Sequence, residues 1–169
     1  MLFSRMLEKR LFEKVCRSIS CPAGEPIEAR IEDRYAELVA AHERLHLGDL
    51  RRFLPVSKHP ARCIGLAARA LFSPRRIERW FEERATVCSL ARGGDPSLWL
   101  LTVHAQLAGA TGAHRDACRR VLDAIVGRVA SRPGAFPGID GRKNILNQLY
   151  LLDAETLRAV VRELYGEGE

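Results

Sequence analysis

The stretch PIEARIEDRYAELVAAHERLHLG, residues Pro26 to Gly48, is the most strongly patterned part of the chain. Side chains recur in it at steps of three or four, at Ile27, Ile31, Tyr35, Leu38, His42 and Leu45. This spacing lays them along one face of an α-helix, so we expect that face to be buried. Pro26 suits the first helical turn. Gly48 is expected to end the helix, because glycine readily adopts the left-handed conformation of a helix terminus.

The helix carries a short chemical motif. His42-Glu43-Arg44-Leu45-His46 reads H-E-x-x-H. On a helix this spacing places two imidazoles one turn apart on one face, where they can share a Zn²⁺ ion. The five residues resemble the motif of the zincin metallopeptidases. The resemblance implies a zinc hydrolase with His42 and His46 as metal ligands and Glu43 as the general base.

A zinc site of this kind needs a third protein ligand. The metzincin extension is excluded, because Asp49 and Arg52 stand where it requires glycine and histidine. The sequence offers four other candidates and selects none: Glu78, Glu82 and Glu83 on the 74–92 segment, and His104.

The alternative interpretation needs no metal. In it, His42 is a hydrogen-bonded core histidine and His46 caps carbonyls near the helix end. We favour this interpretation, and we therefore expect no cofactor, with zinc as the alternative.

Helical patterns fill most of the remaining chain. Ser73-Pro74 and Asp95-Pro96 each read as the start of a new helix. Segment 61–72 is rich in alanine and is expected to be buried on several sides, and 97–110 is apolar nearly all round. No run of alternating β-branched residues indicates a strand. We therefore expect an all-α fold, a bundle of seven or eight helices that forms one domain over residues 1–169.

Two further segments are notable. The first is an amphipathic N-terminal helix over 2–20, in which Phe3, Leu7, Leu11 and Val15 are spaced by four. It is expected to cover the core, and a membrane-surface or partner-binding role is the alternative. The second is the irregular loop 131–141, in which Phe136 is expected to be exposed and to contact a partner.

Composition sets further limits. The chain has 169 residues, 47% of them hydrophobic, which is enough for a sizeable core. The net charge is +6, and the positive charge is mostly arginine, which raises the odds of an anionic partner. The five cysteines are odd in number and contain no C-x-x-C pair, which is typical of an intracellular, reducing compartment such as the cytoplasm. No apolar run is long enough to predict a transmembrane helix.

These observations lead us to expect a non-enzymatic interaction module of the adaptor, inhibitor or effector type. The sequence has no phosphate loop, nucleophile elbow or dinucleotide fingerprint. Nucleic-acid binding is one alternative, through two arginine clusters in which acidic residues also occur: Arg75, Arg76 and Arg79 form the first, and Arg115, Arg119 and Arg120 form the second. Zinc-dependent hydrolysis is the other, although an all-helical chain lacks the strand with which zincins align their substrates. The candidate partner-binding residues are Phe136, Arg75, Arg76, Arg79, Arg115 and Arg119.

Overall fold

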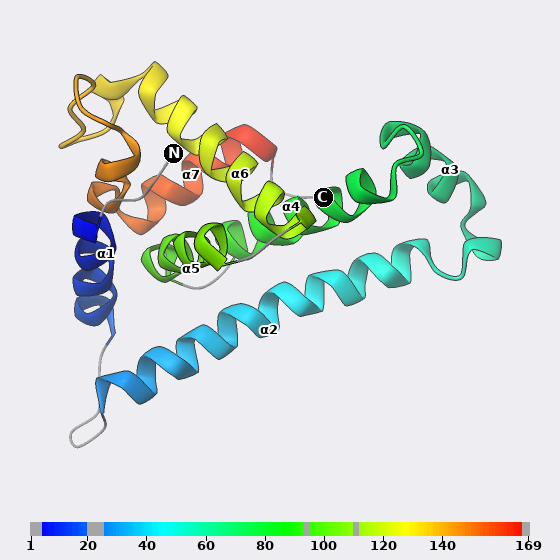
Figure 1. Ribbon diagram of the computed structural model, residues 1–169, viewed down its shortest axis with the longest axis horizontal. Coiled ribbons are helices and arrows are strands. Elements are labelled where there is room, and N and C mark those ends of the chain that lie inside the picture. The colour runs from blue at the N-terminus through cyan, green and yellow to red at the C-terminus, as the bar shows by residue number, and fades with distance from the viewer. Residues whose placement is uncertain (1–4, 20–25, 93–94, 110–111, 167–169) are drawn as a thin grey trace.

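The computed structural model describes residues 5–19, 26–92, 95–109 and 112–166 of the chain. Within these ranges all regular structure is helical, which confirms the predicted all-α bundle (Figure 1). The α-helices are α1 (Arg5–Ser18), α2 (Ile27–Phe53), α3 (Pro60–Arg69), α4 (Pro74–Arg92), α5 (Pro96–Gly109), α6 (Gly112–Ser131) and α7 (Ala154–Tyr165). The described residues also form the short 3₁₀ helices η1 (Val56–Lys58), η2 (Pro133–Ala135) and η3 (Leu146–Leu151).

The core lies where α4, α5, α6 and α7 meet. Helix α4 packs on α6, α2 and α7, and α5 packs on α1, α6 and α7. The predicted inner face of α6 is confirmed, because Ala117, Val121, Leu122, Ile125 and Val129 are all buried. The prediction of a central helix over 97–110 is also confirmed by α5, with Leu98, Trp99, Leu100 and Val103 buried, and residue 110 lies outside the described residues.

Helix α1 belongs to this core. Leu7, Leu11 and Val15 are at most 1% exposed. Lys14 connects α1 to the C-terminal part of the chain. Its Nζ donates hydrogen bonds to the carbonyls of Tyr150 at 2.7 Å and Leu152 at 2.5 Å. Partial burial lowers the pKa of Lys14. The expectation that the N-terminal helix covers the core is met; residues 2–4 and 20 of the predicted 2–20 helix lie outside the described residues.

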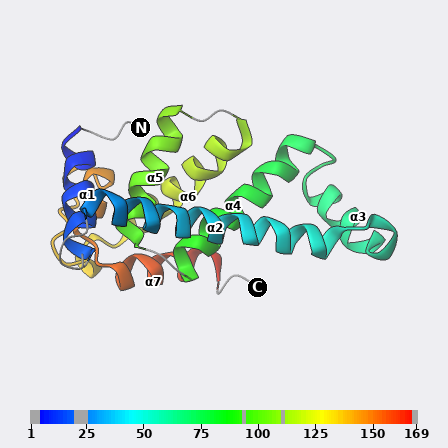
Figure 2. The ribbon, with the colours of Figure 1, turned by 90° about the horizontal axis from the view of Figure 1, so that it is seen from below.

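Helix α2 corrects the prediction about Gly48. The helix continues through Gly48 and ends at Phe53, just before Leu54 and Pro55. Proline disfavours helical geometry at the preceding residue, so Pro55 and not Gly48 marks the boundary. The predicted burial of one whole face is also wrong. Leu38 is buried, but Tyr35 is 44% exposed, because α2 runs along the outside of the bundle and beyond it (Figures 1 and 2).

Segment 61–72 corrects a second prediction. It forms α3 and the turn after it, yet α3 contains no buried residue. Ile64 is 65% exposed, although Ala70, just after the helix, is buried. Figures 1 and 2 show the reason: α3 stands at the far end of the molecule, beside the end of α2 and away from α5, α6 and α7.

The C-terminal part packs tightly. Phe136 in the 131–141 loop is not exposed as expected but packs against the core. The loop is held by Gln148, whose amide accepts from the Asp140 N–H at 2.7 Å and donates to the Asp140 carbonyl at 2.9 Å. A partner-binding role for Phe136 stays a prediction. Asp153 caps α7 as predicted, accepting from the Thr156 N–H at 2.7 Å.

Candidate metal centre

Two histidines of α2 approach each other closely. His42 and His46 are one turn apart, and their Nε2 atoms are 3.0 Å from each other. Their rings meet edge to face, with centroids 4.7 Å apart. The face of α2 that carries them is turned toward the bundle, so both side chains are partly buried. The motif therefore presents its two imidazoles as a pair, as the sequence spacing requires of two ligands to one ion.

Helix α4 brings a carboxylate to this pair. Glu82 Oε2 lies 3.3 Å from His42 Nε2 and 3.5 Å from His46 Nε2. The placement follows from the packing of α4 along α2. Of the four candidate third ligands that the sequence offers, the structure brings Glu82 to the histidines.

A third histidine completes the cluster. His114, in the first turn of α6, places Nδ1 2.6 Å from the same Glu82 oxygen. Hydrogen bonds from His114 and His42 hold the pKa of Glu82 well below its usual range, despite partial burial. Contacts with Cys118 and with Glu82 raise the pKa of His114 to about 10, although burial opposes the shift. Without metal, Glu82 is therefore a carboxylate balanced by an imidazolium.

The spacing of the donor atoms matches a metal-binding face. His42 Nε2, His46 Nε2 and Glu82 Oε2 form a triangle with sides of 3.0, 3.3 and 3.5 Å. Tetrahedral zinc with bonds of 2.0–2.1 Å has ligand atoms about 3.3 Å apart. His42, Glu82 and His114 also form a set in which donor atoms all lie within 4.8 Å of one another. Hydrogen bonds between the side chains hold the cluster together.

The side chains of the cluster are partly buried but remain accessible to solvent. The exposed fractions of its side chains run from 16% for His42 to 30% for His114. Asp49, one turn beyond His46, is buried and lies 3.1 Å from Arg84 Nε of α4. Burial raises the pKa of Asp49, and the charges of Arg84 and His46 oppose that shift. This second contact between α2 and α4 fixes the register in which Glu82 faces the histidines.

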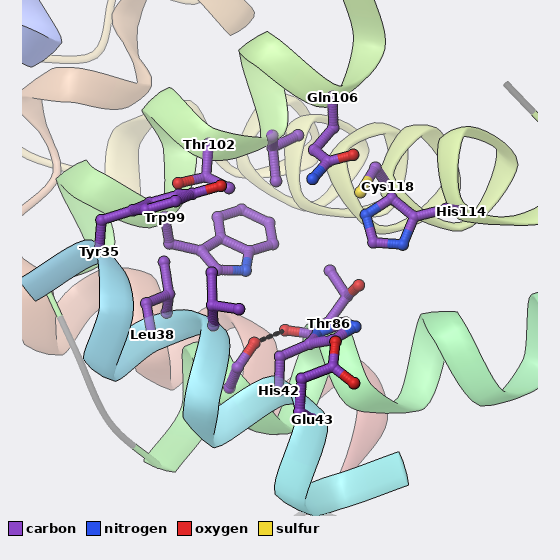
Figure 3. Close-up of a pocket in the computed structure, with 13 residues that line it drawn as sticks. Tyr35, Leu38, His42, Glu43, Thr86, Trp99, Thr102, Gln106, His114 and Cys118 are labelled. Carbon is purple, nitrogen blue, oxygen red and sulfur yellow. Dashed lines mark hydrogen bonds between the residues drawn. The ribbon is translucent and has the colours of Figure 1, made fainter. Parts of the chain in front are cut away.

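A small pocket opens beside the cluster. Its volume is about 180 Å³, and its wall includes His42, Glu43, His114, Cys118 and Trp99. Figure 3 shows His42 and Glu43 projecting from α2 on one side and His114 and Cys118 from α6 on the other. Glu43, the predicted general base of the motif, therefore lines the same cavity as two of the histidines.

The other candidate ligands lie elsewhere. Glu83 pairs with Arg120 at 3.2 Å, and Glu78 is exposed. His104 lies on α5 and lines a different depression, beside Arg5. His114 was not identified from the sequence, because nothing in its local pattern connects it with a motif 72 residues earlier along the chain.

The arginines predicted for partner or nucleic-acid binding lie at the starts of α4 and α6, which the fold brings together. Arg75 of α4 pairs with Asp116 of α6 at 2.8 Å. Arg115 and Arg119, which flank Asp116 on α6, are exposed, as is Arg76, whereas Arg79 is partly covered. The structure thus joins the two clusters but also places carboxylates within them. Their roles remain predictions.

Comparison with protein-family models, with curated proteins and with solved structures finds no match to this chain. In the described residues, no helix is both long and apolar enough to span a membrane.

Proposed function

We propose that the protein binds a zinc ion through His42, His46 and Glu82 and uses it for hydrolysis. The observation that carries this proposal is the triangle of their three donor atoms, whose sides of 3.0–3.5 Å fit one face of a zinc tetrahedron. Two neutral imidazoles and one carboxylate are also the ligand set that catalytic zinc sites use, with a fourth position left for water or substrate.

His114 supports the site through Glu82. Its hydrogen bond to the carboxylate orients the oxygen toward the histidines of α2. Such second contacts fix the orientation of a ligand and tune its basicity. Cys118, one turn along α6, contacts His114 in turn and holds its ring in place.

We place the substrate in the pocket beside the cluster, whose lining includes His42 and Glu43 but not His46 or Glu82. A zinc ion held by His42, His46 and Glu82 would supply Lewis acidity, which polarises a carbonyl or phosphoryl oxygen and makes water more acidic. Glu43 takes a proton from the attacking water and returns it to the leaving group, so that water is added across the broken bond. The cavity of about 180 Å³ admits a small substrate or a small terminal group, and Trp99 and Leu38 offer it apolar walls.

Metal content tests the proposal directly. Untagged protein should contain close to one zinc per chain by elemental analysis, and His42→Ala should lose it, because the triangle loses one corner. His59→Ala, which removes a histidine just after η1 and outside the cluster, is the matched control and should retain zinc. Zinc that is absent from the wild type, or that persists in His42→Ala, would exclude this site.

Glu43→Gln should separate metal binding from catalysis. Glutamine keeps the shape of the side chain but cannot accept the proton, and loss of a general base lowers kcat about 10²- to 10⁴-fold. Zinc content should stay unchanged, since Glu43 is outside the triangle. The rates would be measured on a panel of small chromogenic carboxylic and phosphate esters. If Glu43→Gln hydrolyses them as fast as wild type, Glu43 is not the base.

A non-enzymatic interaction role is the second candidate, and a separate observation favours it. Large apolar side chains are exposed around α3, where the chain leaves the bundle. Exposed apolar patches of this kind mark interaction surfaces. The two proposals concern different parts of the molecule and are compatible.

A further inference from the structure

The far end of the molecule combines exposed apolar side chains with positive charge. We call residues 47–72 the tip; they comprise the end of α2, η1, α3 and the turn into α4. Among the described residues, most of the exposed large apolar side chains belong to it: Leu47, Leu50, Leu54, Val56, Ile64, Leu71 and Phe72. Its basic residues are Arg51, Arg52, Lys58, Arg62 and Arg69, against one acid, Asp49, which is buried beside Arg84.

The turn between α3 and α4 presents two of these apolar residues. Leu71 and Phe72 are 69% and 73% exposed. Both have left-handed backbone conformations, with φ of 52° and 55°. Two successive non-glycine residues in this region are uncommon, and the conformation costs free energy. The turn therefore costs stability and leaves two large apolar side chains exposed to water. Such exposure is typical of a binding surface.

An arginine cleft opens at the base of the tip. It has a volume of about 470 Å³ and lies between α2, α3 and α4. Arg52, Arg62 and Arg69 line it, and Trp80 and Phe53 form part of its wall. In the part of the chain that the structure describes, none of these three arginines forms an ion pair with a carboxylate. Arg84, which pairs with Asp49, also lines the cleft, so Arg52, Arg62 and Arg69 are the guanidinium groups left for a phosphate, which they can bind in a bidentate manner.

We propose that the tip docks on an anionic phospholipid surface. The exposed apolar side chains would enter the headgroup region, and the arginine cleft would bind a lipid phosphate. Apolar side chains flanked by basic residues are the chemistry by which peripheral helices bind anionic bilayers. The charge of the tip favours an anionic surface as its partner. The tip carries five cations and only one acid, Asp49, which is already paired with Arg84.

Vesicle sedimentation tests the apolar contribution. Wild-type protein should sediment with phosphatidylcholine vesicles that contain phosphatidylglycerol, and not with phosphatidylcholine alone. Leu71→Asn/Phe72→Asn should lower the partition coefficient roughly a hundredfold, because it removes two apolar anchors. Asparagine tolerates left-handed backbone, so this variant should fold. The matched control is Phe12→Asn, which removes an apolar side chain that is 48% exposed on α1 and should bind as wild type does.

A second pair of variants tests the cleft. Arg62→Gln should lower binding roughly tenfold or more, because it loses both charge and a phosphate contact. Arg51→Gln removes an equal charge outside the cleft and should cost about fivefold at most, the worth of one cation near an anionic surface. Equal losses would exclude a phosphate site in the cleft. A further experiment measures the binding of inorganic pyrophosphate to the protein. If pyrophosphate binds but vesicles do not, the lipid proposal is overturned in favour of a soluble phosphate ligand.

The membrane proposal is independent of the metal centre. His42→Ala should lose zinc but sediment with anionic vesicles as wild type does, because His42 is outside the tip. Equal sedimentation with neutral and anionic vesicles, or none with either, would overturn the proposal.

Discussion

Zinc is expected to raise the midpoint of thermal unfolding of the metal-free protein by roughly 10 °C. A ligand that binds only the native state stabilises it by about 4.1 kcal/mol when its free concentration is a thousand times Kd. For a chain of this size, each kcal/mol shifts the midpoint by about 2–4 °C. The native state alone assembles the triangle, because Glu82 belongs to a different helix from His42 and His46. Thermal melts of chelator-treated protein, with and without added zinc, measure the shift.

Glu82→Gln is the matched variant for this measurement. Glutamine has nearly the same shape but no charge, so the site keeps its two imidazoles and loses the anionic ligand that completes the triangle. The zinc-dependent shift should fall to a few degrees. Magnesium should produce no shift in either protein, since it prefers an octahedral shell of oxygens to imidazole. A full shift in Glu82→Gln would show that zinc binds elsewhere.

The sequence predicted the helices well because the signals that start them are local. Asp153 caps α7 through a hydrogen bond to a residue three positions later, and Pro74 and Pro96 stand at the starts of α4 and α5. Such signals require no knowledge of the tertiary fold. Gly48 failed as a stop because a glycine costs an α-helix only about 1 kcal/mol, which the rest of α2 offsets.

Burial was predicted less well, because a periodic pattern shows which face of a helix is apolar but not what covers it. The inner face of α6 meets α4 and is buried, whereas Ile64 on α3 has an equally apolar pattern and remains exposed. Phe136 shows the opposite error: it occurs in an irregular loop with glycine and proline, yet it packs on the core. In each case the deciding fact is the position of another segment.

In the candidate site, too, the sequence predicted the residues that are related locally and missed those that only the tertiary fold brings together. His42 and His46 were identified because their relation is a helical repeat within five residues. Glu82 could be placed among the candidates, but Glu78 lies one turn away on α4, and only the packing of α4 on α2 distinguishes them. His114 and the arginine cleft depend on contacts between distant helices. Arg62 and Arg69 are two turns apart on α3, and this spacing was the one local signal that the cleft offered.

Helix α1 leads to the second large prediction. Leu11→Ala should lower the stability of the protein by about 2–5 kcal/mol, because Leu11 is fully buried and its truncation leaves a cavity. The midpoint of thermal unfolding should fall by roughly 10 °C. Circular dichroism melts and urea unfolding would both measure the loss.

The neighbouring residue provides the control. Phe12 is larger than Leu11 but 48% exposed, so Phe12→Ala should lower the stability by only about 1 kcal/mol, because about half of its apolar surface is in water already. The contrast separates the two roles that an amphipathic N-terminal helix can have. A helix that only rests on the surface, ready to leave it for a membrane or a partner, would lose little from either substitution. A helix that completes the core makes the protein depend on Leu11, and the Lys14 hydrogen bonds to Tyr150 and Leu152 tie that dependence to the C-terminal part of the chain.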